Sequence, residues 1–250
     1  SSTSQTITSQ ANGSFTFGTA LTAGHDWNVT VVTQPTGQTC SVTNGSGTNL
    51  SGTVTNVSVT CTTNTYTIGG AVGGLTGSNT VGLKLTDTTS STTQTIASQA
   101  NGSFTFGTAL NFGDGWNVTV ATQPTGQTCA VTNGSGTNLS GNVSTVQVTC
   151  TTNTYTLTYT AGANGSLTGT ASQTVSYGAN GTPVTAIPAT DYHFVQWSDG
   201  STANPRTDMN VTANLAVTAT FAANVLVFTT QPANLVQGGT LGTIAVAVQD

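Results

Sequence analysis

Short runs in which apolar and polar residues alternate fill most of the chain, and Gly, Asn and Pro residues separate these runs. Successive side chains of a β-strand point to opposite faces, so such alternation predicts strands with one apolar face. In the middle of the chain it predicts seven strands, at 66–72, 80–87, 93–98, 102–107, 116–122, 127–132 and 143–150. Seven short strands joined by turns are typical of a β-sandwich.

A block of sequence occurs twice, and its two copies lie 89 residues apart. The run ANGSFTFGTAL stands at 11–21 and at 100–110. Residues 1–66 align without gaps with residues 90–155, and 54 of these 66 positions are identical. The period predicts a complete sandwich at 65–153 and an incomplete copy at 1–64, without the segment that matches 66–89. Such a copy exposes a sheet edge and half of a core.

Charged residues make up only 4% of the chain, and this changes which functions are possible. Glu is absent, Lys84 and Arg206 are the only Lys and Arg residues, and the net charge is −5. Binding to nucleic acid or to an anionic membrane needs clustered Lys and Arg, so we exclude both partners. No apolar run is long enough to insert into a membrane. The abundance of Thr, Ser, Gly and Asn disfavours helices, and an all-β extracellular protein is expected.

The four cysteines form two pairs with the same separation. Cys40 and Cys61 are 21 residues apart, as are Cys129 and Cys150. Metal-binding spacings such as CxxC are absent, and an even number of cysteines in such a chain favours disulfides over zinc. Each bond is expected to contribute about 3 kcal/mol. The second pair is in phase with the apolar residues of its strands, so it should face the core.

Residues 1–153 carry a pattern that includes YTIGGAV, VGLKL, NGSFTF and WNVTV. In this pattern the chain resembles the prealbumin-like sandwich repeats of bacterial surface proteins, which include collagen-adhesin B-type and carboxypeptidase-regulatory-like domains. The resemblance implies a spacer and no catalysis.

A different unit follows at 154–222. Its opening YTLTY, the run VSYGANG, the stretch DYHFVQWSDG at 191–200 and the closing AVTATF resemble the divergent internalin-type B-repeat of bacterial surface proteins. This resemblance implies a small β-grasp-like module, used in tandem as a stalk. The last segment, at 223–250, resembles the first strands of a bacterial immunoglobulin-like domain.

Few residues suggest chemistry. His25 and Asp26 form the single adjacent His/Asp pair, but the second copy has Asp114 and Gly115 there, which indicates a variable loop. His193 is out of phase with its aromatic neighbours and should face solvent. We therefore expect no catalytic residues, no enzyme activity and no cofactor.

Asp199 and Asp208 are the best candidates for binding a cation. They flank a turn that also contains Arg206, which can pair with either carboxylate. Calcium needs several converging carboxylates. No metal site is therefore expected.

The sequence favours a non-catalytic spacer in an extracellular bacterial surface or fibre protein, which is secreted or held on the cell surface. One alternative is a filament of identical chains joined end to end, in which strands from 224–250 of one chain complete the first unit of the next. Another is an adhesin module that binds surface glycans. The aromatic platform for sugars would have to come from Trp27, Trp116 or Trp197, and all three are expected in a core.

Overall fold

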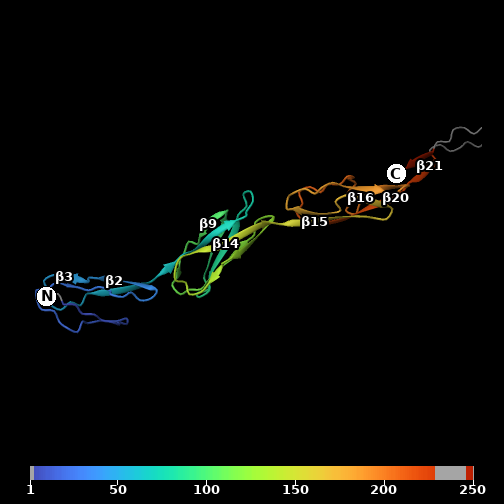
Figure 1. Ribbon diagram of the computed structural model, residues 1–250. Coiled ribbons are helices and arrows are strands. Elements are labelled where there is room, and N and C mark those ends of the chain that lie inside the picture. The colour runs from blue at the N-terminus through green and yellow to red at the C-terminus, as the bar shows by residue number, and fades with distance from the viewer. Residues whose placement is uncertain (1–2, 229–245, 250) are drawn as a thin grey trace, which may run out of the picture.

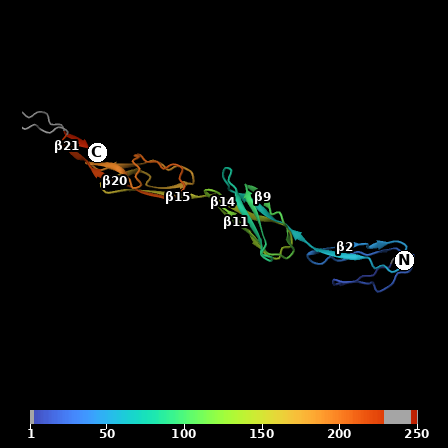
Figure 2. The same ribbon diagram turned by 180° about the vertical axis from the view of Figure 1, so that it is seen from behind.

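The computed structural model describes residues 3–228 and 246–249. These residues form 22 strands and no helix, which confirms the predicted all-β fold class. Accordingly, the described part of the chain has no helix that could cross a membrane. The strands gather into successive small bodies that follow one another in a row from the N-terminus to the C-terminus (Figures 1 and 2).

Residues 65–153 fold into a sandwich of two four-stranded sheets. One sheet has the strand order β13-β11-β7-β8, and the other has the order β12-β14-β6-β9. The strands of the first sheet are β7 (Val81–Asp87), β8 (Thr93–Gln99), β11 (Trp116–Thr122) and β13 (Ser135–Gly136). Those of the second are β6 (Ile68–Gly73), β9 (Gly102–Thr105), β12 (Gln127–Thr132) and β14 (Val143–Thr152). Neighbours pair antiparallel except β6 and β14, which are parallel.

The apolar face of every long strand in this sandwich points into one shared core. Leu83 and Leu85 are fully buried, and Lys84 between them is exposed. Gly70 lets β6 approach β14 closely, because a Cβ atom at this position would overlap the carbonyl oxygen of Val146. The core joins the following residues from both sheets: Ile68, Val72, Val81, Leu83, Leu85, Phe104, Phe106, Trp116, Val118, Val146 and Val148.

Residues 3–64 contain much less regular structure than the second copy. Their four strands are β1 (Trp27–Asn28), β2 (Gln38–Thr43), β3 (Ser46–Gly47) and β4 (Ser58–Thr63). They form two separate two-stranded sheets, β1-β3 and β2-β4. No strand is present between residues 3 and 26.

Residues 154–223 fold around a second core. A four-stranded sheet has the order β17-β15-β20-β19, and β16 pairs with β18 in a smaller sheet. The strands are β15 (Thr154–Ala161), β16 (Gly165–Gly169), β17 (Ser172–Ser176), β18 (Val184–Pro188), β19 (Tyr192–Trp197) and β20 (Leu215–Ala223). Trp197 is fully buried and its ring packs edge-on against Tyr159, beside Phe194.

After Asn224 the described chain consists of β21 (Val225–Phe228) and β22 (Val246–Gln249), which pair antiparallel with each other. The rest of the segment expected to open an immunoglobulin-like domain, 229–245 and 250, lies outside the described residues.

Candidate functional site

The chain passes from the first unit to the second through a single residue, Asn64, between β4 and β5 (Thr65–Tyr66). The backbone N–H of Asn64 donates a hydrogen bond of 2.9 Å to the carbonyl oxygen of Gly37 in the first unit. Its own carbonyl oxygen accepts one of 2.8 Å from the N–H of Phe112 in the second unit. The backbone N–H and carbonyl groups of Asn64 therefore link the two units.

Asn153 makes the same contacts between the second and third units. Its N–H donates to the carbonyl oxygen of Gly126 at 2.9 Å, and its carbonyl oxygen accepts from the N–H of Tyr177 at 2.8 Å. Gly37 and Gly126 are equivalent positions of the 89-residue repeat. Phe112 and Tyr177, in contrast, come from units of different sequence. The second and third units differ in sequence, yet each contacts the preceding unit through the same backbone hydrogen bonds.

Side chains reinforce both of these joints. The hydroxyl of Thr39 donates to the side-chain oxygen of Asn64 at 2.7 Å, and Thr128 donates to Asn153 at the same distance. An aromatic ring also lies against each glycine, since a Cβ atom on Gly37 would overlap Phe112 and one on Gly126 would overlap Tyr177. Both glycines have a positive φ, +73° and +68°, which glycine adopts at little cost.

A third junction, at Asn224, repeats the first of the two backbone hydrogen bonds. The N–H of Asn224, directly after β20, donates to the carbonyl oxygen of Asp191 at 2.9 Å. Asp191 has a φ of +66°, and two residues later Nδ1 of His193 lies 3.0 Å from the side-chain oxygen of Asn224. His193 is therefore half-buried at a junction, whereas its position in the strand predicted exposure to solvent.

The junctions contain no free linker. Immediately after Asn64, β5 pairs with β10 (Leu110–Asn111), and immediately after Asn153, β15 pairs with β17. On the preceding side, each Asn follows the last strand of a ladder that a disulfide closes. Cys40 is bonded to Cys61 between β2 and β4, and Cys129 to Cys150 between β12 and β14. Cys129 and Cys150 are buried, whereas Cys61 is exposed.

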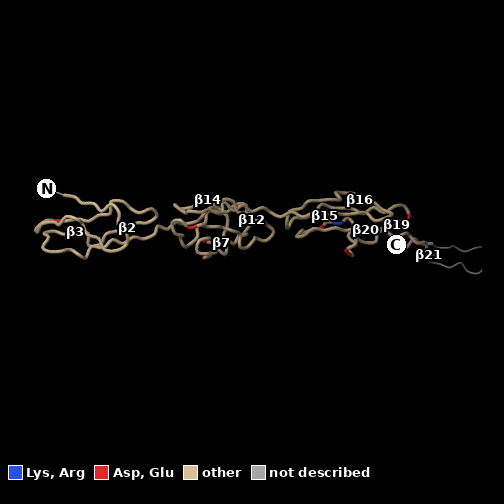
Figure 3. Tube along the Cα trace, turned by 90° about the horizontal axis from the view of Figure 1, so that it is seen from below, with Lys and Arg blue, Asp and Glu red and all other residues tan. Residues whose placement is uncertain are grey.

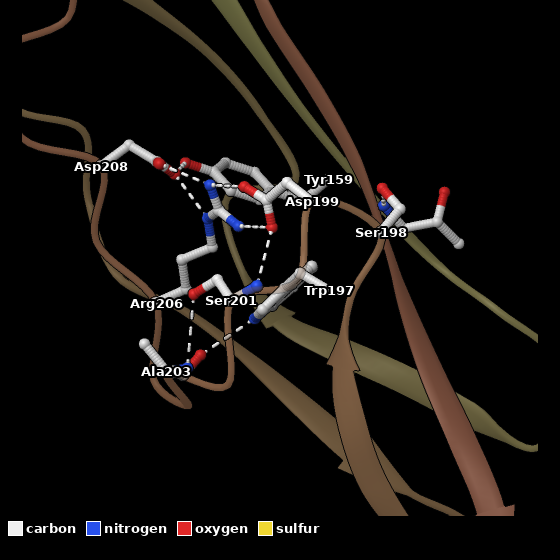
Figure 4. A network of polar contacts seen from close by, with 9 residues as sticks. Tyr159, Trp197, Ser198, Asp199, Ser201, Ala203, Arg206 and Asp208 are labelled. Atoms are coloured by element: carbon white, nitrogen blue, oxygen red, sulfur yellow. Dashed lines mark hydrogen bonds and ion pairs between the residues drawn. The ribbon is translucent and has the colours of Figure 1, made fainter.

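The third unit contains a cluster of charged side chains around Arg206 (Figure 4). The buried guanidinium group binds Asp208 through Nε at 2.9 Å and Nη2 at 2.7 Å. On its other side it binds Asp199 through Nη1 at 2.9 Å and Nη2 at 2.8 Å. The guanidinium carbon also lies 5.6 Å from the ring centre of Trp197, within the range of a cation–π interaction.

This geometry explains the acid–base behaviour of the cluster. Hydrogen bonds from Arg206 hold the pKa of Asp208 and of Asp199 below the ordinary value for Asp. Burial, together with a hydrogen bond of 2.6 Å donated to Asp208, raises the pKa of the Tyr159 hydroxyl. Both carboxylates are thus ionised and bound to the guanidinium, and their oxygens face it instead of an open cation site.

The remaining sequence candidates lie apart from one another. His25 is exposed, and Asp26 accepts a hydrogen bond from the backbone N–H of Asn49. Within residues 3–228 and 246–249, no three His, Cys, Asp or Glu side chains gather as metal ligands would. Trp116 and Trp197 are buried and Trp27 is half-buried.

The roles of Gly37, Gly126, Phe112 and Tyr177 were not predicted from the sequence. A signal was present for one of them, because Ala23 of the first copy is replaced by Phe112 in the second.

Comparison with known proteins gives one family match. Residues 155–225 match the model of the divergent InlB B-repeat domain, which confirms the resemblance predicted for this part of the chain. A search of curated proteins finds no match. The prealbumin-like and immunoglobulin-like resemblances stay predictions. Together with the two disulfides, the match is consistent with an extracellular bacterial surface protein, and the repeat family whose model matches residues 155–225 is typically non-catalytic.

Proposed function

We propose that this chain is a non-catalytic spacer, a semi-rigid stalk segment of an extracellular bacterial surface protein. The observation that carries the proposal is the pair of matching joints at Asn64 and Asn153. Each joins two units through two backbone hydrogen bonds, one side-chain hydrogen bond and an aromatic ring packed on a glycine. Joints of this kind restrict the movement of neighbouring units, as a rod that holds something at a distance requires.

The energetics of a joint favour stiffness. A Gly- or Ser-rich linker behaves as a flexible coil, but here a single residue separates strands that are paired on both sides. Bending a joint breaks its hydrogen bonds, each with a net contribution of about 1 kcal/mol, and separates the ring from the glycine. Few charges lie along the chain (Figure 3), so salt has little to screen.

The test is the distribution of shapes of the whole chain in solution, measured by small-angle X-ray scattering. The decisive variant combines Phe112→Ala with Tyr177→Ala and removes both rings without changing the glycine backbone. Alanine is an acceptable replacement at position 112, because Ala23 occupies the equivalent position of the first copy. Tyr177→Phe is the matched control, since it keeps the ring.

We expect the wild-type chain and the control to scatter as one narrow population of extended rods. The double variant should scatter as a broad ensemble with a smaller mean radius of gyration. Hydrogen exchange supplies a local readout, because the amides of Asn64 and Asn153 should exchange faster in the double variant. A wild-type chain that already requires the broad ensemble would refute the stalk proposal.

Other roles have less support. A glycan-binding adhesin would require an exposed aromatic platform, and two of the three tryptophans are buried. End-to-end joining of identical chains through 224–250 stays a prediction. The described strands of that segment, β21 and β22, pair with each other.

A further inference from the structure

In the second unit, the first long strand and the last strand lie side by side. They are β6 and β14, and they pair parallel over five pairs of residues that begin with Ile68 opposite Val143. The chain enters this unit at Thr65, shortly before β6, and leaves it at Thr152, the last residue of β14. One ladder therefore joins the strand through which the chain enters to the strand through which it leaves.

The third unit has the same arrangement, although its sequence is different. Its first strand, β15, pairs parallel with its last strand, β20, over five pairs of residues that begin with Leu157 opposite Leu215. In both units these two strands lie in the middle of a four-stranded sheet, in the orders β12-β14-β6-β9 and β17-β15-β20-β19. The two units therefore share this feature of their topology.

The parallel direction of these ladders decides how a unit responds to a pull on the two ends of its chain. The pull acts on the N-terminal end of the first strand and on the C-terminal end of the last strand. In a parallel pair these are opposite ends of the ladder, so the strands are sheared along their length and the evenly spaced hydrogen bonds are loaded together. In an antiparallel pair they would lie at the same end, and the bonds would break one after another.

An asparagine side chain extends each ladder by one hydrogen bond at the end where the chain enters. The backbone N–H of Thr67 donates to Oδ1 of Asn142 at 3.0 Å, and the N–H of Thr156 donates to Oδ1 of Asn214 at 2.9 Å. Each Thr directly precedes the first paired residue of the first strand, and each Asn directly precedes the last strand. Two units of different sequence therefore have the same bond at the same place.

Apolar side chains cover the inward face of both ladders. Ile68, Val146 and Val148 are fully buried in the second unit, as are Leu157 and Ala219 in the third. A hydrogen bond beside such a core is shielded from water that would otherwise replace it, and an unpaired polar group there is costly. Breaking either ladder also opens the core of its unit.

In the second unit a disulfide also holds the strand through which the chain leaves. Cys150 lies near the C-terminal end of β14 and is bonded to Cys129 of β12. β14 therefore cannot slide past β12 while this bond is intact. A pull on the two ends of the unit is then resisted between β14 and β6, where the ladder is in shear.

We propose that the β6-β14 and β15-β20 ladders, together with Asn142 and Asn214, are tension clamps, which keep the second and third units folded when the chain is pulled from its ends. This function goes beyond spacing, because a clamp transmits a pulling force without unfolding. It does not rest on the stiffness of the joints. A chain with flexible joints could still contain strong clamps, so scattering tests the stalk proposal and pulling tests this one.

The test pulls one unit of the whole chain in two directions by single-molecule force spectroscopy. Two added cysteines serve as attachment points, because the four native cysteines are in disulfides. In the second unit, Thr65→Cys with Thr152→Cys loads the ladder in shear. Thr65→Cys with Ser144→Cys is the matched control, which opens the same ladder from one end. All three positions are exposed.

The third unit is tested with an equivalent set. Thr154→Cys with Ala223→Cys loads its ladder in shear, and Thr154→Cys with Ala213→Cys opens it from one end; these positions are also exposed. At one loading rate, we expect the mean unfolding force in shear to be at least about twice the force in the opening direction in both units, because five pairs of residues are loaded together.

The asparagine bonds have a test of their own. At constant force in shear, Asn142→Ala should make the second unit unfold about fivefold faster, which is the effect of one hydrogen bond on an unfolding rate. Asn214→Ala should do the same in the third unit. Asn142→Asp is the matched control and should unfold at the wild-type rate, because it keeps an oxygen that accepts the bond. Both asparagines are exposed, so these variants keep the fold of the unpulled chain.

The direction of pulling decides the outcome. Equal unfolding forces in the two directions would overturn the proposal, as would a lower force in shear. Unfolding rates that stay unchanged in both alanine variants would overturn the role given to the asparagines.

Discussion

Replacing Arg206 with methionine should destabilise the third unit strongly and in a pH-dependent way. The guanidinium makes four close contacts with Asp199 and Asp208, and its own side chain is 7% exposed. Methionine keeps much of the apolar volume beside Trp197 but leaves both carboxylates without a counter-charge. Removing one partner of a fully buried ion pair costs about 3–5 kcal/mol. The Asp208 and Asp199 side chains are 20% and 38% exposed, so hydration reduces the expected loss to about 2–3 kcal/mol.

Urea unfolding followed by NMR measures this loss in the intact chain. The indole N–H of Trp197 donates to the carbonyl oxygen of Ala203 at 2.9 Å, so its signal reports the third unit. With a slope of about 1–3 kcal/mol per molar urea, the midpoint should fall by roughly 0.7–3 M at pH 7. Asp199→Asn is the matched control and should cost less, because Arg206 keeps its two bonds to Asp208.

The pH dependence separates an ionic effect from lost packing. The pKa of each Asp is lowered in the folded wild type, so the pair stabilises the fold above about pH 4 and this contribution disappears as the pH falls through the folded pKa values. In the variant the carboxylates can be protonated at little cost. The difference between wild type and variant should therefore be largest at pH 7 and smaller at pH 3. An equal difference at both pH values would refute the ionic explanation.

Three further outcomes are expected. Replacing both Cys129 and Cys150 with alanine should lower the unfolding free energy of the second unit by about 2–4 kcal/mol, measured by calorimetry, and reducing agent should then have no further effect on this unit. Tyr177→Ala alone should loosen the second joint and leave the first unchanged, as measured by amide exchange at the two asparagines. Burial favours the neutral form of Asp87, but hydrogen bonds from Ser90 and Thr89 together outweigh it and keep its pKa low; Ser90→Ala should therefore raise the pKa of Asp87, measured by NMR titration.

The strands of the second unit could be predicted because their signal is local. Alternation placed 116–122 and 127–132 at the observed bounds, and the other strands within one or two residues at most ends. A sandwich buries one face of each strand, so apolar residues recur at every second position of the sequence. The last strand continues to Thr152, beyond the expected end at 150, because it leads into the joint.

The joints and the ion cluster depend on contacts that are distant in sequence. The pairing of Arg206 with nearby carboxylates could be anticipated, but Tyr159 joins them from a strand 49 residues away from Asp208. Phe112 meets Gly37 only after the two units are placed end to end. The periodicity within one unit does not predict this contact, although the replacement of Ala23 in the first copy by Phe112 in the second indicates its position.

The difference between the two copies shows what makes these segments into strands. Intrinsic preferences cannot explain why 102–105 forms a strand and 13–16 does not, since ANGSFTFGTAL contains both segments and is identical in the two copies. The surroundings of these residues differ between the two copies, because β6 and β7 cover them in the second copy. Strand formation here therefore depends on packing against these two strands, in agreement with the strong context dependence of β preference.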